Sequence, residues 1–232
     1  MSRHLRWQVA ITLLGFALLG SLLAYLAFAF GTVVVPAAGG TYVEALIGQP
    51  QYINPILCQP NPVDRDLCSL IFNGLTKLNE RGEVLPDLAE SWEISTDGLR
   101  YTFHLRRDVR WHDQTPFTAD DVVFTVEAMQ DPRYKGDPYL AELWRNVGVV
   151  KLDTHTIQFV LREPFAPFLS YATIGILPAH ALTDVPAESL PNHPFNQHPI
   201  GTGMFQVEEV TAEDALLQAN PLFFGPKPYL DR

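Results

Sequence analysis

The hydrophobic pattern of the chain begins with one long apolar stretch. Residues 9–35 carry no charged side chain. This run is longer than the core of an ordinary signal peptide and exceeds the roughly 20 residues that cross a bilayer as a helix. Arg3 and Arg6 precede it, and Glu44 is the first charge after it. The positive-inside rule therefore puts residues 1–8 in the cytoplasm and everything after residue 40 on the extracytoplasmic side of the cell membrane, in a single-pass arrangement.

Cleavage of this stretch stays open. Two segments, 27–29 and 35–37, have small residues at the spacing that signal peptidases require. Residues 9–35 are therefore interpreted as either a retained transmembrane anchor or a signal sequence. Residues 36–41 then form a small-residue linker, and weak alternation over residues 42–47 predicts the first strand of an exported domain.

Periodic apolar positions next predict a helix, a hairpin and a second helix. Residues 64–78 have helical spacing, and Asn73-Gly74 offers the left-handed residue that ends many helices. Alternation on both sides of the turn at 95–98 predicts a hairpin over residues 92–105 with one buried face. Thr118, followed by two acids, predicts the start of a helix that ends at Asp131-Pro132.

The second half of the chain repeats the mixture of strands and short helices. The pattern predicts a second hairpin over residues 147–151 and 157–161. It predicts two final strands over residues 204–210 and 215–219. Seven prolines between residues 164 and 199 leave room for short helices such as one around 168–173. The predicted fold class is therefore α/β, in the mixed α+β sense, preceded by one N-terminal transmembrane helix.

Composition narrows the function classes. The 232 residues have a formal net charge of −10, a sign that argues against a nucleic-acid partner. Roughly 190 residues after the linker suffice for one large domain or two small ones. The histidines are solitary and form no metal or catalytic cluster. The acidic pair Asp120 and Asp121 suits the first turn of a helix, where it needs no catalytic role. No catalytic residue, metal site or cofactor is predicted, and the protein is not expected to be an enzyme.

Two local features have both a structural and a functional interpretation. Cys58 and Cys68 lie in the exported part, where a disulfide between them can form, and two unpaired thiols are the alternative. The Gly201-Thr202-Gly203 turn either approaches a ligand or another chain closely, or is a plain tight turn into the next strand.

A family resemblance rests on the central motifs. Residues 85–113, LPDLAESWEISTDGLRYTFHLRRDVRWHD, resemble the signature stretch of the solute-binding protein family 5, the peptide- and nickel-binding components of ABC importers. The resemblance continues through residues 115–124, 176–180, 201–203 and 220–229 in the family's order. Gln114 stands where the family usually has glycine, and Met204-Phe205 where it usually has proline and tyrosine.

The resemblance implies a periplasmic-binding-protein-like first lobe. Residues 42–78 and 196–232 would form its core sheet, and residues 79–195 an inserted subdomain with the two hairpins and the Thr118 helix. Family members are about twice as long, so the second lobe is expected to be absent and the chain to be a truncated member or a fragment. The segments that match the family's cleft give the predicted ligand-binding residues: Asn54, Phe72, Asn73, Gly74, Gly201, Thr202 and Gly203. Trp92, Tyr101, Phe103, Trp111 and Val122 are expected to be core.

The implied function is that of an extracytoplasmic substrate-binding protein. It would bind peptides, or a related small solute, and deliver them to an ABC permease and its ATPase. The alternative is a membrane-anchored lone lobe that acts as an interaction or sensory module without transport.

Overall fold

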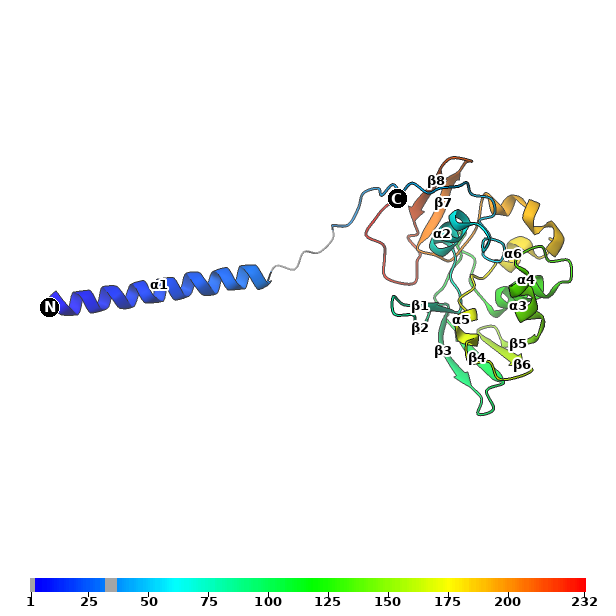
Figure 1. Cartoon of the computed structure of the whole chain (residues 1–232), viewed down its shortest axis with the longest axis horizontal. Coiled ribbons are helices and arrows are strands. Elements are labelled where there is room, and N and C mark those ends of the chain that lie inside the picture. The colour runs from blue at the N-terminus through cyan, green and yellow to red at the C-terminus, as the bar shows by residue number, and fades with distance from the viewer. Residues whose placement is uncertain (1–2, 32–36) are drawn as a thin grey trace. The chain divides into compact units, whose positions relative to one another are not determined.

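A computed structural model of the chain (Figure 1) describes residues 3–31 and 37–232, which divide into two compact units, Met1–Ala38 and Gly39–Arg232. The first unit contains the helix α1 (Arg3–Gly31). Its segment Trp7–Gly31 has 25 residues, a mean hydropathy of 2.2 and no buried share, so it is long and apolar enough to cross a membrane. The predicted N-terminal apolar helix is confirmed over residues 9–31, and residues 32–35 of that prediction lie outside the described part.

The second unit is a mixed α and β fold, as predicted. Its short helices and strands interleave along the chain. In order they are α2 (Pro62–Ile71), β1 (Thr76–Leu78), β2 (Val84–Pro86), β3 (Ala89–Ile94), β4 (Arg100–Leu105), α3 (Ala119–Gln130), α4 (Pro138–Arg145), β5 (Val147–Asp153), β6 (Thr156–Leu161), α5 (Phe168–Tyr171), α6 (Ala179–Leu182), the 3-10 helices η1 (Ala187–Asn192) and η2 (Pro194–Asn196), β7 (Phe205–Val210) and β8 (Ala215–Ala219).

The two predicted hairpins are confirmed, and they join into one antiparallel sheet. Its strand order is β3-β4-β6-β5, because β4 also pairs with β6, with Phe103 opposite Ile157. Alternate residues of β4 and β6 point into the core, among them Phe103 and Phe159, whose rings meet edge to face at 5.6 Å. Burying one face of each strand produces the period of two seen in the sequence.

The helix α3 packs beside this sheet, next to β5 and β6. Its start is the one predicted: Thr118 is the N-cap and forms a capping box with Asp121, and Asp131 is the C-cap. Val122 and Met129 of its apolar face are fully buried. Of the motif residues predicted as core, Tyr101, Phe103, Trp111 and Val122 are buried, while Trp92 is half-buried and packs against Phe103.

The end of α2 differs from the prediction. The helix stops at Ile71, and its C-cap Phe72 is extended, with φ −121° and ψ 150°. Gly74 does not take the left-handed conformation. A Cβ at Gly74 would lie 2.5 Å from the main chain of Thr173, so glycine is needed here for the close passage of two segments.

Two other elements also depart from the sequence analysis. The prediction of a strand over residues 42–47 is wrong, because these residues pair with no neighbouring strand and Val43 and Ile47 are exposed. The helix α4 was not predicted, although Asp137 caps it and Pro138 is its first residue.

The two ends of the second unit lie side by side. The Gly39 amide donates to Tyr229 O at 2.6 Å, and the Tyr42 amide to Arg232 O at 3.0 Å. The Ala219 amide of β8 donates to Asp231 O at 2.9 Å, so the C-terminal segment runs between the N-terminal segment and β8 (Figure 1). The finer division into residues 42–78 with 196–232 and an insert of residues 79–195 stays a prediction.

Candidate functional site

A hollow of about 330 Å³ in the second unit is the leading candidate for a binding site. The hollow is lined by the loop before α2, by one side of α2, by the segment from the end of α5 to Gly175, and by Leu140 of α4. Its lining residues are Pro55, Cys58, Gln59, Arg65, Cys68, Ser69, Phe72, Leu140, Ser170, Tyr171, Thr173, Ile174 and Gly175.

One face of α2 supplies the first wall. Arg65, Cys68 and Ser69 stand at positions i, i+3 and i+4, which a helix places on one face, and the extended C-cap residue Phe72 continues this wall. The helix begins here because Pro62 is its first residue and the Asn61 side chain accepts the Val63 amide.

A buried carboxylate ties α2 to the segment before it. The two oxygens of Asp64 accept the amides of Gln51 at 2.7 Å and Tyr52 at 2.9 Å. The loop that supplies Pro55, Cys58 and Gln59 to the hollow is therefore fastened to the same helix that supplies the first wall.

The opposite wall approaches α2 closely at a glycine. A Cβ at Gly175 would lie 2.7 Å from the Pro55 Cβ and 2.8 Å from the Phe72 Cβ. Main-chain bonds fix this wall, because the Ile176 amide donates to Asn73 O at 3.0 Å and the Thr76 amide to Ala172 O at 3.2 Å. Any side chain at position 175 would push the walls apart.

The chemistry of the hollow is apolar with hydroxyl groups and one cation. Arg65 is its charged side chain, and its Nη1 donates to Gln59 O at 2.7 Å. Ser69, Ser170, Thr173 and Tyr171 add hydroxyl groups, and none of the described lining residues is acidic. In a chain of net charge −10, this patch can accept a neutral or anionic group without electrostatic repulsion from its own walls.

The two cysteines contribute free thiols to the lining of the hollow. Both are buried, and Cys58 Sγ lies 3.6 Å from Pro55 O. Burial raises the pKa of the Cys68 thiol far above its usual value, and a side-chain hydrogen bond with Cys58 raises it further. The sequence leaves open a disulfide or two unpaired thiols. The structure has two free thiols that are hydrogen-bonded to each other, and a disulfide between them stays a prediction.

The residues predicted as ligand-binding from the family motifs lie together but are mostly inside the protein. Phe72 lines the hollow. Asn73 accepts the Thr202 hydroxyl at 3.1 Å and donates to Asp87 at 2.8 Å, while Asn54, fully buried, donates to Asn196 at 3.3 Å. These side chains connect segments of the chain, and a direct ligand contact for Asn54, Asn73, Gly74 and Thr202 stays a prediction.

The Gly201-Thr202-Gly203 turn packs closely against the main chain of α2 in the same molecule. A Cβ at Gly201 would lie 1.8 Å from Ile71 O, and one at Gly203 would lie 2.2 Å from Leu70 O. The Gly203 amide donates to Ile71 O at 2.8 Å. The turn therefore supports the end of the helix whose side chains line the hollow, and contact of Gly201 or Gly203 with a ligand stays a prediction.

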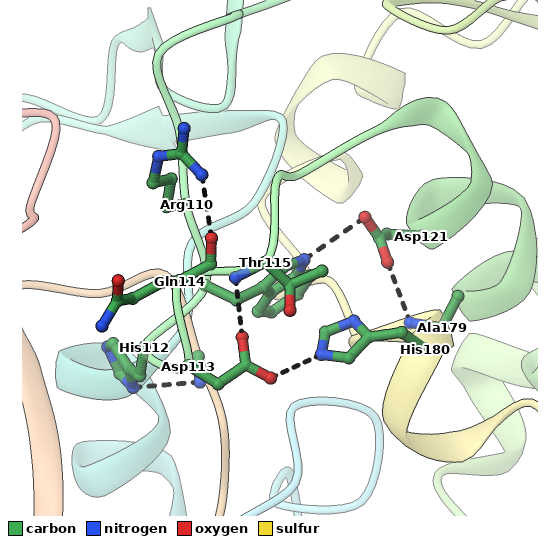
Figure 2. Close-up of polar contacts among 10 residues, drawn as sticks. Arg110, His112, Asp113, Gln114, Thr115, Asp121, Ala179 and His180 are labelled. Atoms are coloured by element: carbon green, nitrogen blue, oxygen red, sulfur yellow. Dashed lines mark hydrogen bonds and ion pairs between the residues drawn. The ribbon is translucent and has the colours of Figure 1, made fainter.

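Two histidines expected to be solitary have specific partners (Figure 2). His180 Nε2 lies 2.7 Å from Asp113 Oδ2. His112 accepts the Gly201 amide at Nδ1, 3.1 Å away, and its Nε2 lies 3.3 Å from Gly203 O. Burial lowers the pKa of His112 to about 4, although the hydrogen bond to Gly203 and the charge of Asp113 oppose that shift.

The predicted structural role of the acidic pair is confirmed. Asp121 accepts the Thr118 amide, the Trp111 Nε1 and the Ala179 amide, the last of which Figure 2 also shows. Burial raises the pKa of Asp121, and these hydrogen bonds act in the opposite direction. Its neighbour Asp120 is exposed and pairs with Lys151 at 2.7 Å.

Residues 3–31 and 37–232 contain no cluster of three or more His, Cys, Asp or Glu side chains that could hold a metal ion. Among the residues that line the hollow, Gln59, Arg65, Ser69, Leu140 and the wall 170–175 were not predicted from the sequence. The helical spacing of Arg65, Cys68 and Ser69 was the available signal, but the helix was predicted from its apolar positions Leu67, Leu70 and Ile71 and this other face was not considered.

The chain resembles known binding proteins over most of its length. A family model described as bacterial extracellular solute-binding proteins, family 5, middle region, matches residues 83–232. The dipeptide-binding protein of Escherichia coli K12 is 32% identical over 220 residues, which cover 86% of this chain and 41% of that protein.

Solved structures agree with the sequence matches. The oligopeptide-binding protein AppA of Bacillus subtilis, in complex with a nonapeptide, has a TM-score of 0.78 at 31% identity, over 85% of this chain and 40% of that one. NikZ of Campylobacter jejuni, in complex with Ni(L-His), has a TM-score of 0.69 at 32% identity, over 84% and 38%. The chain thus spans about two-fifths of the length of these relatives.

Proposed function

The chain belongs to the bacterial extracellular solute-binding proteins of family 5, and we propose that its second unit binds a peptide or a related small solute in the hollow beside α2. The observation that carries the proposal is the hollow itself: two walls joined by main-chain bonds, one cation and several hydroxyl groups over an apolar floor. Its volume falls at the lower end of small-ligand sites.

Each class of lining group has a role toward such a solute. The guanidinium of Arg65 pairs with a carboxylate, such as the C-terminus of a peptide. The hydroxyl groups of Ser69, Ser170 and Thr173 exchange hydrogen bonds with a peptide backbone directly or through water. Phe72, Leu140 and Ile174 offer apolar surface to a side chain.

The proposed physiological role is delivery of that solute to an ABC permease and its ATPase. Dipeptide and oligopeptide binding are properties of the relatives, and we extend them to this chain as a proposal. The helix α1 either retains the second unit at the outer face of the membrane or directs its export. In both cases the binding unit works on the extracytoplasmic side.

The proposal is tested by thermal unfolding of the full chain in detergent micelles, with and without a mixed pool of di- to pentapeptides. A solute that binds the native state raises the unfolding midpoint by mass action. The rise should disappear when the peptides lack a free carboxylate and in the variant Arg65→Gln.

Arg81→Gln is the matched control, because Arg81 is an exposed arginine in the turn between β1 and β2 and does not line the hollow. It should keep the full rise. A midpoint that no peptide moves in the wild-type chain would overturn the proposed function, and equal loss in both arginine variants would overturn the role of Arg65.

A second candidate function is that of a membrane-anchored interaction module. The observation that favours it is a run of exposed apolar side chains before α2: Tyr42 is 63% exposed, Val43 86% and Ile47 101%. This function predicts a midpoint indifferent to peptides, together with self-association that is lost when these three side chains are replaced by serine.

A further inference from the structure

His112 holds the turn 201–203 at three points. Its Nδ1 accepts the Gly201 amide at 3.1 Å, its Nε2 lies 3.3 Å from Gly203 O, and its own amide donates to Gly201 O at 2.9 Å. Figure 2 shows the imidazole of His112 on the far side of Asp113 from His180. Sequence separations of about 90 residues make this a tertiary contact.

These partners require one protonation state of the imidazole. Nδ1 faces an amide N–H, so it must carry a lone pair, and Nε2 faces a carbonyl, so it must carry the hydrogen. This is the neutral Nε2–H tautomer. A second proton at Nδ1 would point one N–H at another, because the Gly201 amide can only donate.

The turn that His112 holds lies against the wall of the proposed solute site. Gly203 donates its amide to Ile71 O at 2.8 Å, and Thr202 donates its hydroxyl to Asn73 at 3.1 Å. Ile71 and Asn73 flank Phe72, which lines the hollow. A change at His112 can therefore reach the hollow through contacts that are continuous in the structure.

We propose that His112 is an acid-sensitive positioning residue: its neutral imidazole clamps the turn 201–203 against the end of α2, and its protonation releases the turn and weakens solute binding in the hollow. The second half of this inference rests on the proposed function, and the first half does not. Release needs no other reaction than the uptake of one proton at Nδ1.

The charged groups around His112 are carboxylates, which favour its protonated form, and burial opposes them. Asp113 is adjacent and favours the imidazolium, but its Oδ2 already pairs with His180. Asp121 contacts this loop through its hydrogen bond from Trp111 Nε1, and its carboxylate already accepts three N–H groups in all. The low pKa of His112, about 4, agrees with a site built for the neutral ring, in which burial outweighs Asp113.

The direct test follows the Gly201 amide of the full chain in micelles by ¹H–¹⁵N NMR between about pH 7 and about pH 3. Its resonance should shift with an apparent pKa near 4, as should the Nδ1 resonance of His112. In His112→Asn the Gly201 shift should vanish, since the Asn Oδ1 keeps an acceptor at the Nδ1 position and does not titrate. His198→Asn, which removes an exposed imidazole three residues before the turn, should leave the shift unchanged.

Peptide affinity gives the second readout. Apparent affinity scales with the clamped fraction, so the wild-type chain should bind about twofold more weakly near pH 4 than at neutral pH and about tenfold more weakly one unit lower. His112→Asn should keep only the pH dependence that protonation of the peptide's own carboxylate causes, so these fold-changes are read as the affinity of the wild-type chain relative to His112→Asn at the same pH. A Gly201 resonance that does not follow the titration of His112 would overturn the clamp, and identical pH dependence in wild type and His112→Asn would overturn its control of the site. Absence of peptide binding at every pH, with the Gly201 shift intact, would overturn the proposed function alone.

Discussion

At position 201 the main chain of α2 occupies the space where a side chain would stand. A methyl group on Gly201 would lie 1.8 Å from Ile71 O, and that atom is main chain, which cannot rotate away. Gly201→Ala should therefore destabilise the second unit by about 3 kcal/mol, at the upper end of overpacking costs. Urea denaturation followed by tryptophan fluorescence measures this loss, because Trp111 and Trp144 are fully buried.

Gly148→Ala is the matched control for this change. Gly148 is an exposed residue of β5, and a Cβ there would lie 3.5 Å from the nearest atoms of Val160, an ordinary contact distance. We expect a change within about 0.5 kcal/mol. Equal stability of the two alanine variants would show that the turn 201–203 does not press on α2 as the structure has it.

Cys58 and Cys68 give a prediction about oxidation. Their thiols already interact, and exchange with a disulfide oxidant outside the cell would join them and release two protons and two electrons to that oxidant. The closed loop is short, so the bridge should add about 2 to 3 kcal/mol to the free energy of unfolding. Protein secreted into an oxidising compartment should gain no mass on denaturation and alkylation until it is reduced.

The single variant Cys58→Ser controls for this measurement. It should be alkylated at Cys68 without reduction. Alkylation of both cysteines in the unreduced wild-type chain would contradict the bridge and leave the two buried thiols of the structure as the native state.

At the scale of elements, the carboxylate of Asp121 holds the start of α3 in place by hydrogen bonds. Asp121 accepts the Thr118 amide at 2.9 Å, the Ala179 amide at 2.9 Å and the Trp111 Nε1 at 3.3 Å. Asp121→Ala leaves one buried and two part-buried donors without their acceptor, so it should cost about 3 kcal/mol of unfolding free energy, measured by urea denaturation.

The adjacent Asp120→Ala tests whether the loss is specific. Asp120 is exposed and pairs with Lys151, so its removal should cost less than about 1 kcal/mol. The opposite order of the two variants would contradict the role given to the Asp121 network.

The elements that could be predicted from the sequence are those with local causes. The hairpins β3–β4 and β5–β6 show a period of two because one face of each is buried, and α3 carries its cap and its stop in the sequence itself. The helix α4 was missed because eight residues after a Pro- and Gly-rich loop give too short a periodic pattern. Residues 42–47 were wrongly predicted as a strand because alternation does not supply the neighbouring strand that a ladder needs.

The candidate site depends on contacts that the sequence does not display. The family motifs led to Phe72 and to the support behind it, Asn73 and Thr202. The opposite wall at Thr173 and Gly175 follows α2 by about 100 residues, and no local pattern marks it. The same holds for His112, whose partners Gly201 and Gly203 are 89 and 91 positions away.

At the scale of the whole molecule, α1 and the second unit should behave as independent parts. The second unit has its own core, built around residues such as Trp111 and Phe159, and none of the Trp7–Gly31 segment is buried. Membrane insertion of α1 and folding of residues 39–232 thus depend on different side chains, and one substitution should affect one without the other.

Leu19→Arg, in the middle of the apolar segment, separates the two properties. A charge at the centre of a spanning helix costs about 3 kcal/mol on insertion scales, whereas Trp7→Arg places the same charge at its end, where the cost is small. Flotation with lipid vesicles should therefore recover the wild-type chain and Trp7→Arg but much less of Leu19→Arg. All three should unfold in detergent at the same urea midpoint, because the fluorescence change on unfolding comes from Trp111 and Trp144, which are buried in the second unit, whereas Trp7 is already exposed in the folded chain. A lower midpoint in Leu19→Arg would mean that α1 stabilises the binding unit, and the hollow would then have to be studied with its membrane helix in place.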